Sequence, residues 1–180
     1  MNDDYDLSPL KKKKRKNSRQ KGNKFENDVC KILNERFKTT EFCRTPGSGA
    51  FATTHTLPKH LTIGGDLITP KNFKFLIECK KGYNKNLQIP ELFSCKSWIS
   101  GVLYKVLAES EKYQKSPLLI IKQDRKEELV IIPSKLRPIL WPTRNKFIEV
   151  NLSDDWNWSI IPLKEILDNC PDSFFFENLP

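Results

Sequence analysis

The stretch of residues 64–81 constrains this chain more than any other, because it combines a strand pattern with two acids and a lysine. Within it, apolar and polar residues alternate from residue 73 to residue 80, which is the period of a half-buried β-strand. Glu78 and Lys80 are two positions apart, so their side chains lie on one face of this strand. An acid and an amine therefore share one surface of the predicted sheet.

A second strand is predicted over residues 61–68, and it carries Asp66. Residues 69–72 (Thr-Pro-Lys-Asn) supply turn chemistry, so the sequence predicts an antiparallel hairpin that brings Asp66 close to Glu78. Two adjacent carboxylates repel each other unless a divalent cation lies between them. Mg²⁺ binds through one or two carboxylates, waters and substrate phosphates, so the pattern favours phosphodiester hydrolysis, with Lys80 orienting or activating the attacking water. The alternative is a solvated strand face bearing an ion pair.

A helix is predicted over residues 22–37, where apolar residues recur at helical spacing. Glu26 falls on the edge of the apolar face, where a carboxylate is expected to have a partner. One explanation is an ion pair with Arg36, which lies near the same face. The other is that Glu26 points toward the predicted hairpin and helps to hold the cation.

A glycine-containing loop over residues 46–50 follows a short predicted strand over residues 41–45. Arg44 and Ser48, at the mouth of this loop, are candidates for binding phosphate oxygens. The alternative is an ordinary turn.

The pair Gly65-Asp66 followed by Glu78-Cys79-Lys80 resembles the PD-(D/E)XK nuclease signature, with Gly65 in place of the usual proline. Two earlier motifs, Lys21-Gly22-x-x-Phe25-Glu26 and Arg44-Thr45-Pro46-Gly47-Ser48-Gly49, precede it in the order found in archaeal-type Holliday junction resolvases. The resemblance covers roughly residues 21–133. Two departures, Asn27 where these resolvases usually carry arginine and a longer loop over residues 51–60, concern the substrate more than the chemistry.

The resemblance implies roles for individual side chains. The implied metal ligands are Glu26, Asp66, Glu78 and the backbone carbonyl of Cys79, for Mg²⁺ or alternatively Mn²⁺. The implied catalytic residues are Glu26, Asp66, Glu78, Lys80 and Ser48, and Arg44 and Ser48 would contact DNA. A resolvase cuts two strands of a two-fold symmetric junction, so branched DNA and a homodimer are the expected partners.

The expected fold is α/β, with a restriction-endonuclease-like core in which helices flank a mixed central sheet of about five strands. Apolar runs over residues 117–122 and 129–132 predict strands central to that sheet. A helix starting near Pro90 should pack on it. The expected organisation is a disordered basic arm over residues 1–21, a nuclease core over residues 22–133 and a C-terminal extension over residues 134–180.

Much of the net charge of +9 lies near the N-terminus, because residues 11–24 hold nine of the 31 Lys and Arg residues and no acid. An arm of this kind binds phosphate backbones without sequence preference. The alternatives are a solubilising tail and a nuclear import signal over residues 9–16. The arm's six consecutive basic residues, taken as DNA-binding, are Lys11, Lys12, Lys13, Lys14, Arg15 and Lys16.

The extension is predicted to hold strands over residues 146–152 and 156–161 and a short helix over residues 162–169. Three consecutive phenylalanines, Phe174, Phe175 and Phe176, would be a liability if exposed in a free tail. They are expected to dock on this chain or on a partner subunit, and a weaker alternative is docking on another protein.

No apolar run is long enough to cross a membrane, and the N-terminus lacks the apolar segment of a signal peptide. The expected location is therefore the cytoplasm, in association with the nucleoid, or the nucleus if the basic run is an import signal. The expected function is metal-dependent, structure-selective cleavage of DNA, with Holliday junctions as the first candidate substrate. The alternatives are a restriction-type or repair nuclease of the same fold, acting on duplexes, flaps or ends, and a DNA-binding protein without catalysis.

Overall fold

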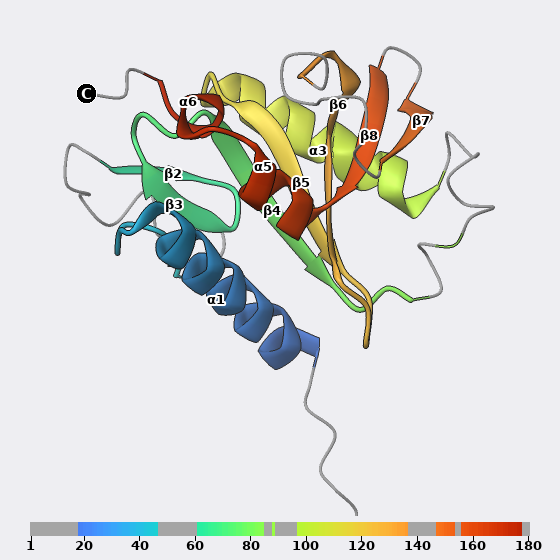
Figure 1. Ribbon diagram of the computed structural model, residues 1–180. Helices are drawn as coiled ribbons and strands as arrows, with labels where there is room; N and C mark the ends of the chain where they lie inside the picture. The colour runs from blue at the N-terminus through green and yellow to red at the C-terminus, as the bar shows by residue number, and fades with distance from the viewer. Residues whose placement is uncertain are drawn as a thin grey trace, which may run out of the picture.

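The computed structural model describes residues 18–46, 61–84, 88, 97–136, 147–153 and 156–177 (Figure 1). Helices and strands alternate along much of the chain. In order they are α1 (Ser18–Phe37), β1 (Cys43–Arg44), β2 (Leu61–Gly64), β3 (Leu67–Pro70), β4 (Phe75–Lys81), α3 (Trp98–Lys112), β5 (Ser116–Lys122), β6 (Glu128–Pro133), the 3₁₀ helix η2 (Ser134–Leu136), β7 (Ile148–Ser153), β8 (Trp156–Pro162), α5 (Leu163–Asn169) and α6 (Asp172–Phe175).

The main sheet has five strands in the order β4-β5-β6-β8-β7. The β4 and β5 strands run parallel, and the other neighbours are antiparallel, so the sheet is mixed as predicted. The predicted strands over residues 117–122 and 129–132 are β5 and β6, which lie inside the sheet. A smaller sheet, in the order β1-β3-β2, lies beside β4 and is joined to it by a bridge between Gly65 and Ile77.

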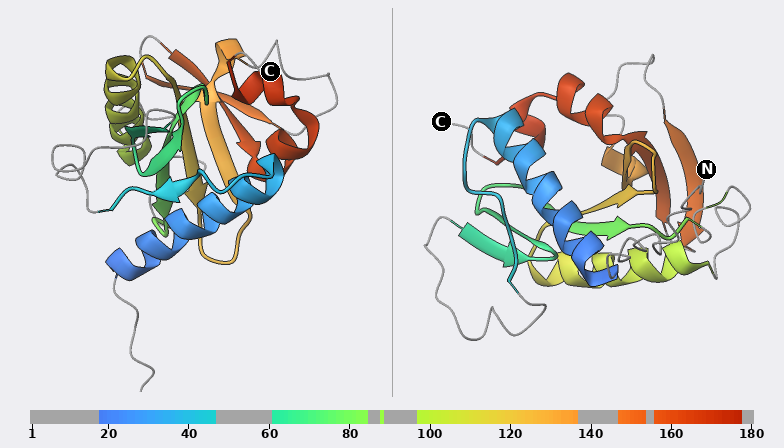
Figure 2. Two further views of the ribbon diagram at one scale, coloured as in Figure 1. Left: turned by 90° about the vertical axis from the view of Figure 1, so that its left-hand side faces the viewer. Right: turned by 90° about the horizontal axis from the view of Figure 1, so that it is seen from below.

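Helices cover both faces of the main sheet (Figure 2), and an apolar core lies on each face. The first packs α1, α5 and α6 against one face, with Phe25 and Ile77 among its buried residues. The second packs α3 against the other face around Trp158 and Leu76. Strand β4 is buried on both faces over residues 75–77, because Leu76 enters the second core, and only its second half is half-buried as predicted.

Helix α1 begins at Ser18, four residues before the predicted start. The predicted arm over residues 1–21 is therefore too long, because its last four residues form the first turn of the helix. Helix α3 begins at Trp98, after the Ser97 cap, and its apolar face is buried as predicted. Residues 89–96, which include the predicted helix start near Pro90, lie outside the described residues.

The predicted hairpin between residues 61–68 and 73–80 is wrong. Strand β2 pairs antiparallel with β3 instead, and Gly65 and Asp66 form the two-residue connection between them. A turn does occur where it was expected, since the Phe73 amide donates to the Pro70 carbonyl over 3.0 Å. That turn carries the chain from one sheet to the other, where β4 pairs with β5. The alternation of residues identifies a strand but not its partner.

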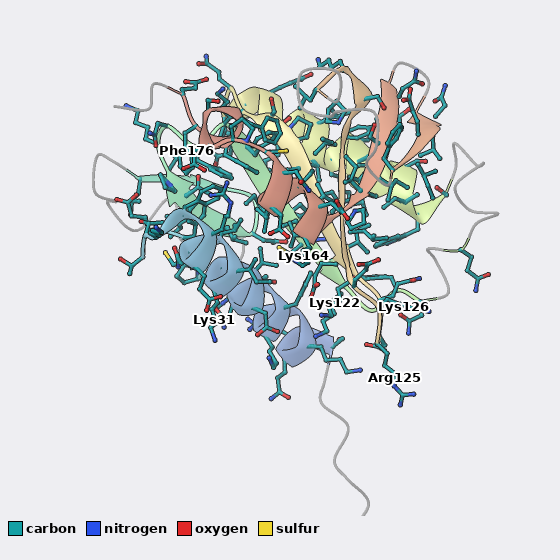
Figure 3. The ribbon with its side chains drawn as sticks, in the orientation of Figure 1. Lys31, Lys122, Arg125, Lys126, Lys164 and Phe176 are labelled. Carbon is teal, nitrogen blue, oxygen red and sulfur yellow. The ribbon has the colours of Figure 1, made fainter. Side chains whose placement is uncertain are left out.

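The C-terminal extension is part of the same fold, because β8 pairs with β6 and β7 pairs with β8. No spatial boundary therefore follows residue 133. Phe175 is only 1% exposed, and Phe174 and Phe176 pack against the same core (Figure 3). The three rings were expected to dock on this chain or on a partner subunit, and the structure shows them docked on the chain's own core. Phe174 and Phe176 remain partly exposed, so the use of this tail to bind another protein stays a prediction.

Arg36 joins α1 to the C-terminal end of α5. Its guanidinium donates to the carbonyls of Leu167 over 2.6 Å and Cys170 over 3.1 Å, and it lies 2.8 Å from Asp172. These contacts rule out the expected pairing of Arg36 with Glu26. The positive charge of Arg36 also complements the negative C-terminal end of α5.

Replacing Arg36 with methionine should lower the free energy of unfolding by about 2 kcal/mol, because it leaves two carbonyls without their charged donor. Lys31→Met is the control, since Lys31 is exposed and lies 3.8 Å from Glu35 in an i,i+4 pair worth under about 0.5 kcal/mol. Urea unfolding of the two variants measures the difference. Equal decreases in the free energy of unfolding would show that the Arg36 contacts between α1 and the C-terminal extension do not stabilise the fold.

None of the helices in the described ranges is long and apolar enough to cross a membrane.

Candidate active site

The site is built where the β2–β3 turn meets the outer edge of β4. The Asp66 amide donates to the carbonyl of Ile77 over 2.9 Å, and an Asp66 carboxylate oxygen accepts from the Cys79 amide over 2.8 Å. Asp66 is therefore held by its backbone and its side chain against the strand that carries Glu78. The predicted proximity of these two acids is correct, although the pairing that creates it differs.

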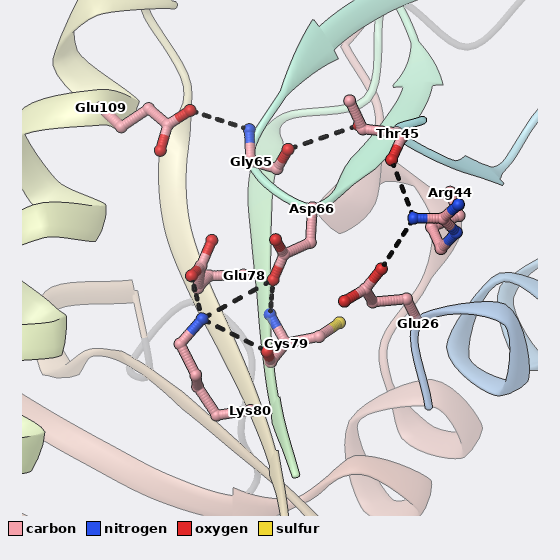
Figure 4. A network of polar contacts seen from close by, with 9 residues as sticks. All are labelled: Glu26, Arg44, Thr45, Gly65, Asp66, Glu78, Cys79, Lys80 and Glu109. Carbon is pink, nitrogen blue, oxygen red and sulfur yellow. Dashed lines mark hydrogen bonds and ion pairs between the residues drawn. The ribbon is translucent and has the colours of Figure 1, made fainter. Parts of the chain in front are cut away.

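Lys80 lies at the point where three oxygen atoms converge (Figure 4). Its Nζ atom contacts Glu78 Oε1 and lies 3.4 Å from the Cys79 carbonyl oxygen and 3.8 Å from Asp66 Oδ2. The side chains of Lys80 and Glu78 share the face of β4 that the alternation predicted. The family resemblance assigns these three groups to a metal ion, together with Glu26, which does not contact Lys80 here. In this structure a positive charge already lies among them.

Glu26 reaches the same region from α1 but belongs to a different contact. Its Oε2 atom lies 3.6 Å from Arg44 Nη1, and Arg44 also donates to the Thr45 carbonyl over 3.2 Å. Among the residues that the structure describes, no group of three or more Asp, Glu, His or Cys side chains is arranged to hold a metal ion. In this structure Glu26 contacts Arg44 and not the Lys80 cluster, so the shared cation of the three acids stays a prediction. Two of them converge, and Arg44 holds the third beside Asp66.

Glu109 is an acid of this site that the sequence analysis missed. It lies on α3, and its Oε1 atom accepts from the Gly65 amide over 3.1 Å. That bond holds the turn immediately before Asp66. The signal was present, because Glu109 follows Val102 by seven residues and Val106 by three, and so falls on the buried face of its helix.

Two acids of the site, Glu78 and Glu26, have a raised pKa in the folded protein. Burial and the neighbouring Asp66 carboxylate raise the pKa of Glu78 to about 7, even though Lys80 opposes the shift. Burial and Asp66 also raise the pKa of Glu26, against the effect of Arg44. Burial lowers the pKa of Lys80, but the Glu78 and Asp66 carboxylates outweigh it, so the pKa of Lys80 is raised overall. The same carboxylates whose repulsion raises the pKa of Glu78 therefore keep Lys80 protonated.

The raised pKa of Glu78 predicts that the free energy of unfolding depends on pH in protein freed of metal by EDTA. Between the unfolded pKa of 4.5 and the folded pKa of about 7, the folded chain binds more protons than the unfolded chain. Stability is therefore lost as pH rises through this window. Glu78→Gln cannot ionise, so its stability relative to wild type should improve by about 2 kcal/mol between pH 4.5 and pH 8.

Thermal unfolding at the two pH values measures this change. Glu111→Gln, an exposed position on α3, is the control and should follow wild type. A relative stability of Glu78→Gln that stays constant with pH would contradict the buried, acid-crowded environment of Glu78.

The residues present fit a divalent cation. Hard cations bind carboxylate and carbonyl oxygens, and Asp66, Glu78 and the Cys79 carbonyl supply both kinds around one ammonium group. The repulsion that raises the pKa of Glu78 is also what a bound cation relieves. Nitrogen and sulfur ligands, which zinc prefers, do not take part in this cluster, since the Cys79 side chain lies in the core.

A cavity of about 610 Å³ opens beside this cluster. Its lining includes Glu26, Asp66, Cys79 and Lys80, together with residues from the start of α1 and the end of β4. Ser48 and the basic run Lys11–Lys16 lie outside the described residues, so their predicted roles are not placed. Arg44 lies next to the site through its contact with Glu26.

The fold and the site define a class of protein. A mixed sheet covered by helices on both faces, with Asp66 and the Glu78-Cys79-Lys80 triplet at its edge, is the arrangement expected of a PD-(D/E)XK nuclease with a restriction-endonuclease-like core. A family model described as "Phage putative PDDEXK endonuclease" matches residues 17–155, and the chain belongs to this family. The predicted class is therefore confirmed, and the match extends past residue 133 through β7.

Two known proteins are similar to this chain. Protein D14 of Escherichia phage T5 is 33% identical over 122 residues, which cover 65% of this chain and 71% of that protein. The 1.6 Å structure of Archaeoglobus fulgidus Hjc, a Holliday junction resolvase from an archaeal hyperthermophile, aligns with 81% of this chain and 99% of its own. The sequence identity is 15% and the TM-score is 0.38, a superposition too loose to bear on fold or substrate.

Proposed function

We propose that this nuclease is a metal-dependent endonuclease that cuts branched DNA, with the four-way junction as its first candidate substrate and a homodimer as its active form. The observation that supports the chemistry is the convergence of Asp66, Glu78 and the Cys79 carbonyl on one positively charged group. Asp66, Glu78 and Cys79 would hold Mg²⁺ or Mn²⁺.

The reaction needs charge stabilisation and a prepared nucleophile, because uncatalysed phosphodiester hydrolysis is extremely slow. A bound divalent cation supplies stabilisation of the negative charge that develops on the phosphate. Lys80 holds the attacking water by donating a hydrogen bond from Nζ, and Glu78 orients Lys80 through their ion pair. Arg44 binds a phosphate oxygen of the substrate, and Glu26 fixes the guanidinium from the side. Glu109 positions Asp66 by holding the Gly65 amide.

The substrate proposal rests on the order of the motifs along the chain. Lys21-Gly22 with Glu26, then Arg44, then Gly65-Asp66, and then the Glu78 triplet follow the pattern of archaeal-type junction resolvases. A four-way junction has two-fold symmetry and needs two cuts, which a symmetric dimer supplies. Basic residues before α1 add affinity that weakens with salt.

The test compares cleavage of a fixed junction, a mobile junction, a flap and a linear duplex, each with Mg²⁺ and with Mn²⁺. Paired, symmetric cuts confined to the junctions are expected. Sequence-specific cutting of linear duplex would replace the junction proposal with a restriction-type activity, and cutting confined to flaps would replace it with repair-type processing.

Glu78→Ala separates catalysis from binding in the same substrates. It should abolish cleavage and leave junction binding in Ca²⁺ within about two-fold of wild type, because Glu78 would hold the metal ion and orient Lys80 and contributes little to the docking surface. Glu111→Ala, exposed on α3, should retain cleavage. Wild-type protein that binds junctions but cuts no DNA with any divalent cation would show that the chain is a binding protein.

A further inference from the structure

Tyr83 lies at the mouth of the site in a backbone conformation that needs an explanation. It follows β4, three residues after Lys80, and its φ of 50° lies in the left-handed region that non-glycine residues rarely adopt. The preceding Gly82 has a φ of 93°. Two successive left-handed residues turn the chain sharply at the end of the strand, and they leave Tyr83 44% exposed.

This conformation is held in place from several sides. The Gly82 amide donates to the Lys122 carbonyl over 2.9 Å. The Asn84 side chain donates to the Asp124 carboxylate over 3.2 Å and accepts from the Asp124 amide over 3.0 Å. Neighbouring strands therefore fix the residues on both sides of Tyr83. The surrounding structure imposes the left-handed backbone, as is typical of functional sites.

The Tyr83 ring is supported on one face by a second aromatic ring. It stacks on Trp98 at the start of α3, with ring centroids 4.2 Å apart and planes inclined by 20°. Trp98 packs in turn against the second apolar core. An aromatic ring that is stacked on one side and half-exposed is a ready surface for a further planar group.

The position of this ring relates it to the chemistry. Tyr83 lines the cavity of about 610 Å³ that also contains Asp66 and Lys80. Lys21 and Lys81 line the same cavity, and with Lys24 they line an adjoining cavity of about 580 Å³. Within the described part of the chain, Lys21 and Lys81 are in ion-pair contact with no carboxylate.

More cations surround these two cavities. Arg125 and Lys126 lie at the tip of the β5–β6 turn, near the start of α1 (Figure 3). Asp124 of that turn lines both cavities, so the turn and the start of α1 border one surface. Lysines and arginines beside an exposed aromatic ring form the pairing that single-stranded nucleic acid binds, with phosphates on the cations and a base on the ring.

We propose, building on the proposed nuclease function, that this surface binds an unpaired segment of DNA, with one base stacked on Tyr83 and the neighbouring phosphates on Lys21 and Lys81. A base inside a duplex is already stacked on its neighbours and cannot lie on Tyr83. On a junction, the surface therefore takes a nucleotide that is unpaired at the branch point, and the stacked base sets the phosphate that reaches Lys80.

The test measures binding in Ca²⁺, so it does not depend on cleavage. A short single strand carrying the fluorescent base 2-aminopurine is titrated with protein, in parallel with a paired duplex of the same length. Tyr83→Leu should bind the single strand about ten-fold more weakly and lose the stacking-induced quenching, with duplex affinity within about two-fold of wild type. Tyr83→Trp should restore both signals.

Tyr104→Leu is the matched control, because Tyr104 is 46% exposed on α3 and should change neither affinity. Single-strand affinity that is unchanged in Tyr83→Leu, or lost equally in Tyr104→Leu, would overturn the proposal, and so would equal weakening of duplex binding. Each of these results leaves the nuclease proposal standing. Conversely, wild-type protein that never cleaves DNA would refute the nuclease and leave the Tyr83-dependent binding intact.

Discussion

Replacing Lys80 with methionine should lower kcat for DNA cleavage by about 10²–10⁴-fold, the usual contribution of a group that positions or activates the attacking water. Methionine keeps the length and apolar stem of the lysine and removes the ammonium that contacts Glu78 and lies 3.8 Å from Asp66. DNA binding in Ca²⁺ should remain within about two-fold of wild type, since the loss is confined to the reaction step. Single-turnover cleavage of a junction measures the change.

Lys164→Met provides the control for loss of one positive charge. Lys164 is an exposed lysine on α5 that pairs with Asp168 and does not line the cavity beside the Asp66 cluster, so its replacement should leave kcat unchanged. A Lys80→Met enzyme that cleaves at the wild-type rate would contradict the assignment of Lys80 to the reaction.

Gly65→Ala should lower the free energy of unfolding by at least about 3 kcal/mol and displace Asp66. Gly65 has a φ of +69°, and a Cβ atom there would lie 2.2 Å from the carbonyl oxygen of Ile77. That oxygen accepts the hydrogen bond from the Asp66 amide, so relieving the clash breaks the contact that places the acid. Urea unfolding and cleavage rate should both decline.

Gly101→Ala is a control of opposite sign. A Cβ atom at Gly101 meets nothing within 4 Å, and the residue lies inside α3, so alanine should stabilise the protein by about 0.5–1 kcal/mol. Equal effects at Gly65 and Gly101 would show that the β2–β3 turn is not tightly constrained.

The same geometry explains a departure from the nuclease signature. The usual residue before the aspartate is proline, whose ring fixes φ near −65° and which has no amide hydrogen. Gly65 needs a positive φ and donates its amide to Glu109 over 3.1 Å. A proline at position 65, usual in other members of the class, would therefore disrupt the site in this chain.

Much of the main sheet could be predicted because its strands have simple patterns. Residues 117–122 and 129–132 are continuous apolar runs, and the structure buries them inside the sheet as β5 and β6. The strands and helix after residue 146 were also predicted within a few residues. Their membership of the same sheet was not predicted, since strand pairing between distant segments leaves no local signal.

The site was predicted in part, and its residues show why. Glu78 and Lys80 share a face because the strand period fixes it. Asp66 was placed near them through an antiparallel hairpin, whereas the structure achieves this with a turn docked beside a parallel strand. Glu26 was predicted to bind the cation because the sequence pattern shows only which face of the helix Glu26 occupies. Its contact with Arg44 depends on tertiary distances that a sequence does not contain.

The most direct measurement of the central claim is the position of Mn²⁺ in crystals of the protein, located by anomalous diffraction. We expect one peak within coordination distance of Asp66, Glu78 and the Cys79 carbonyl, and we expect it to disappear in Asp66→Asn crystals. Mn²⁺ bound elsewhere in protein that is active with Mn²⁺, with these three oxygens still gathered around Lys80, would contradict the claim that they form the metal-binding centre of a nuclease.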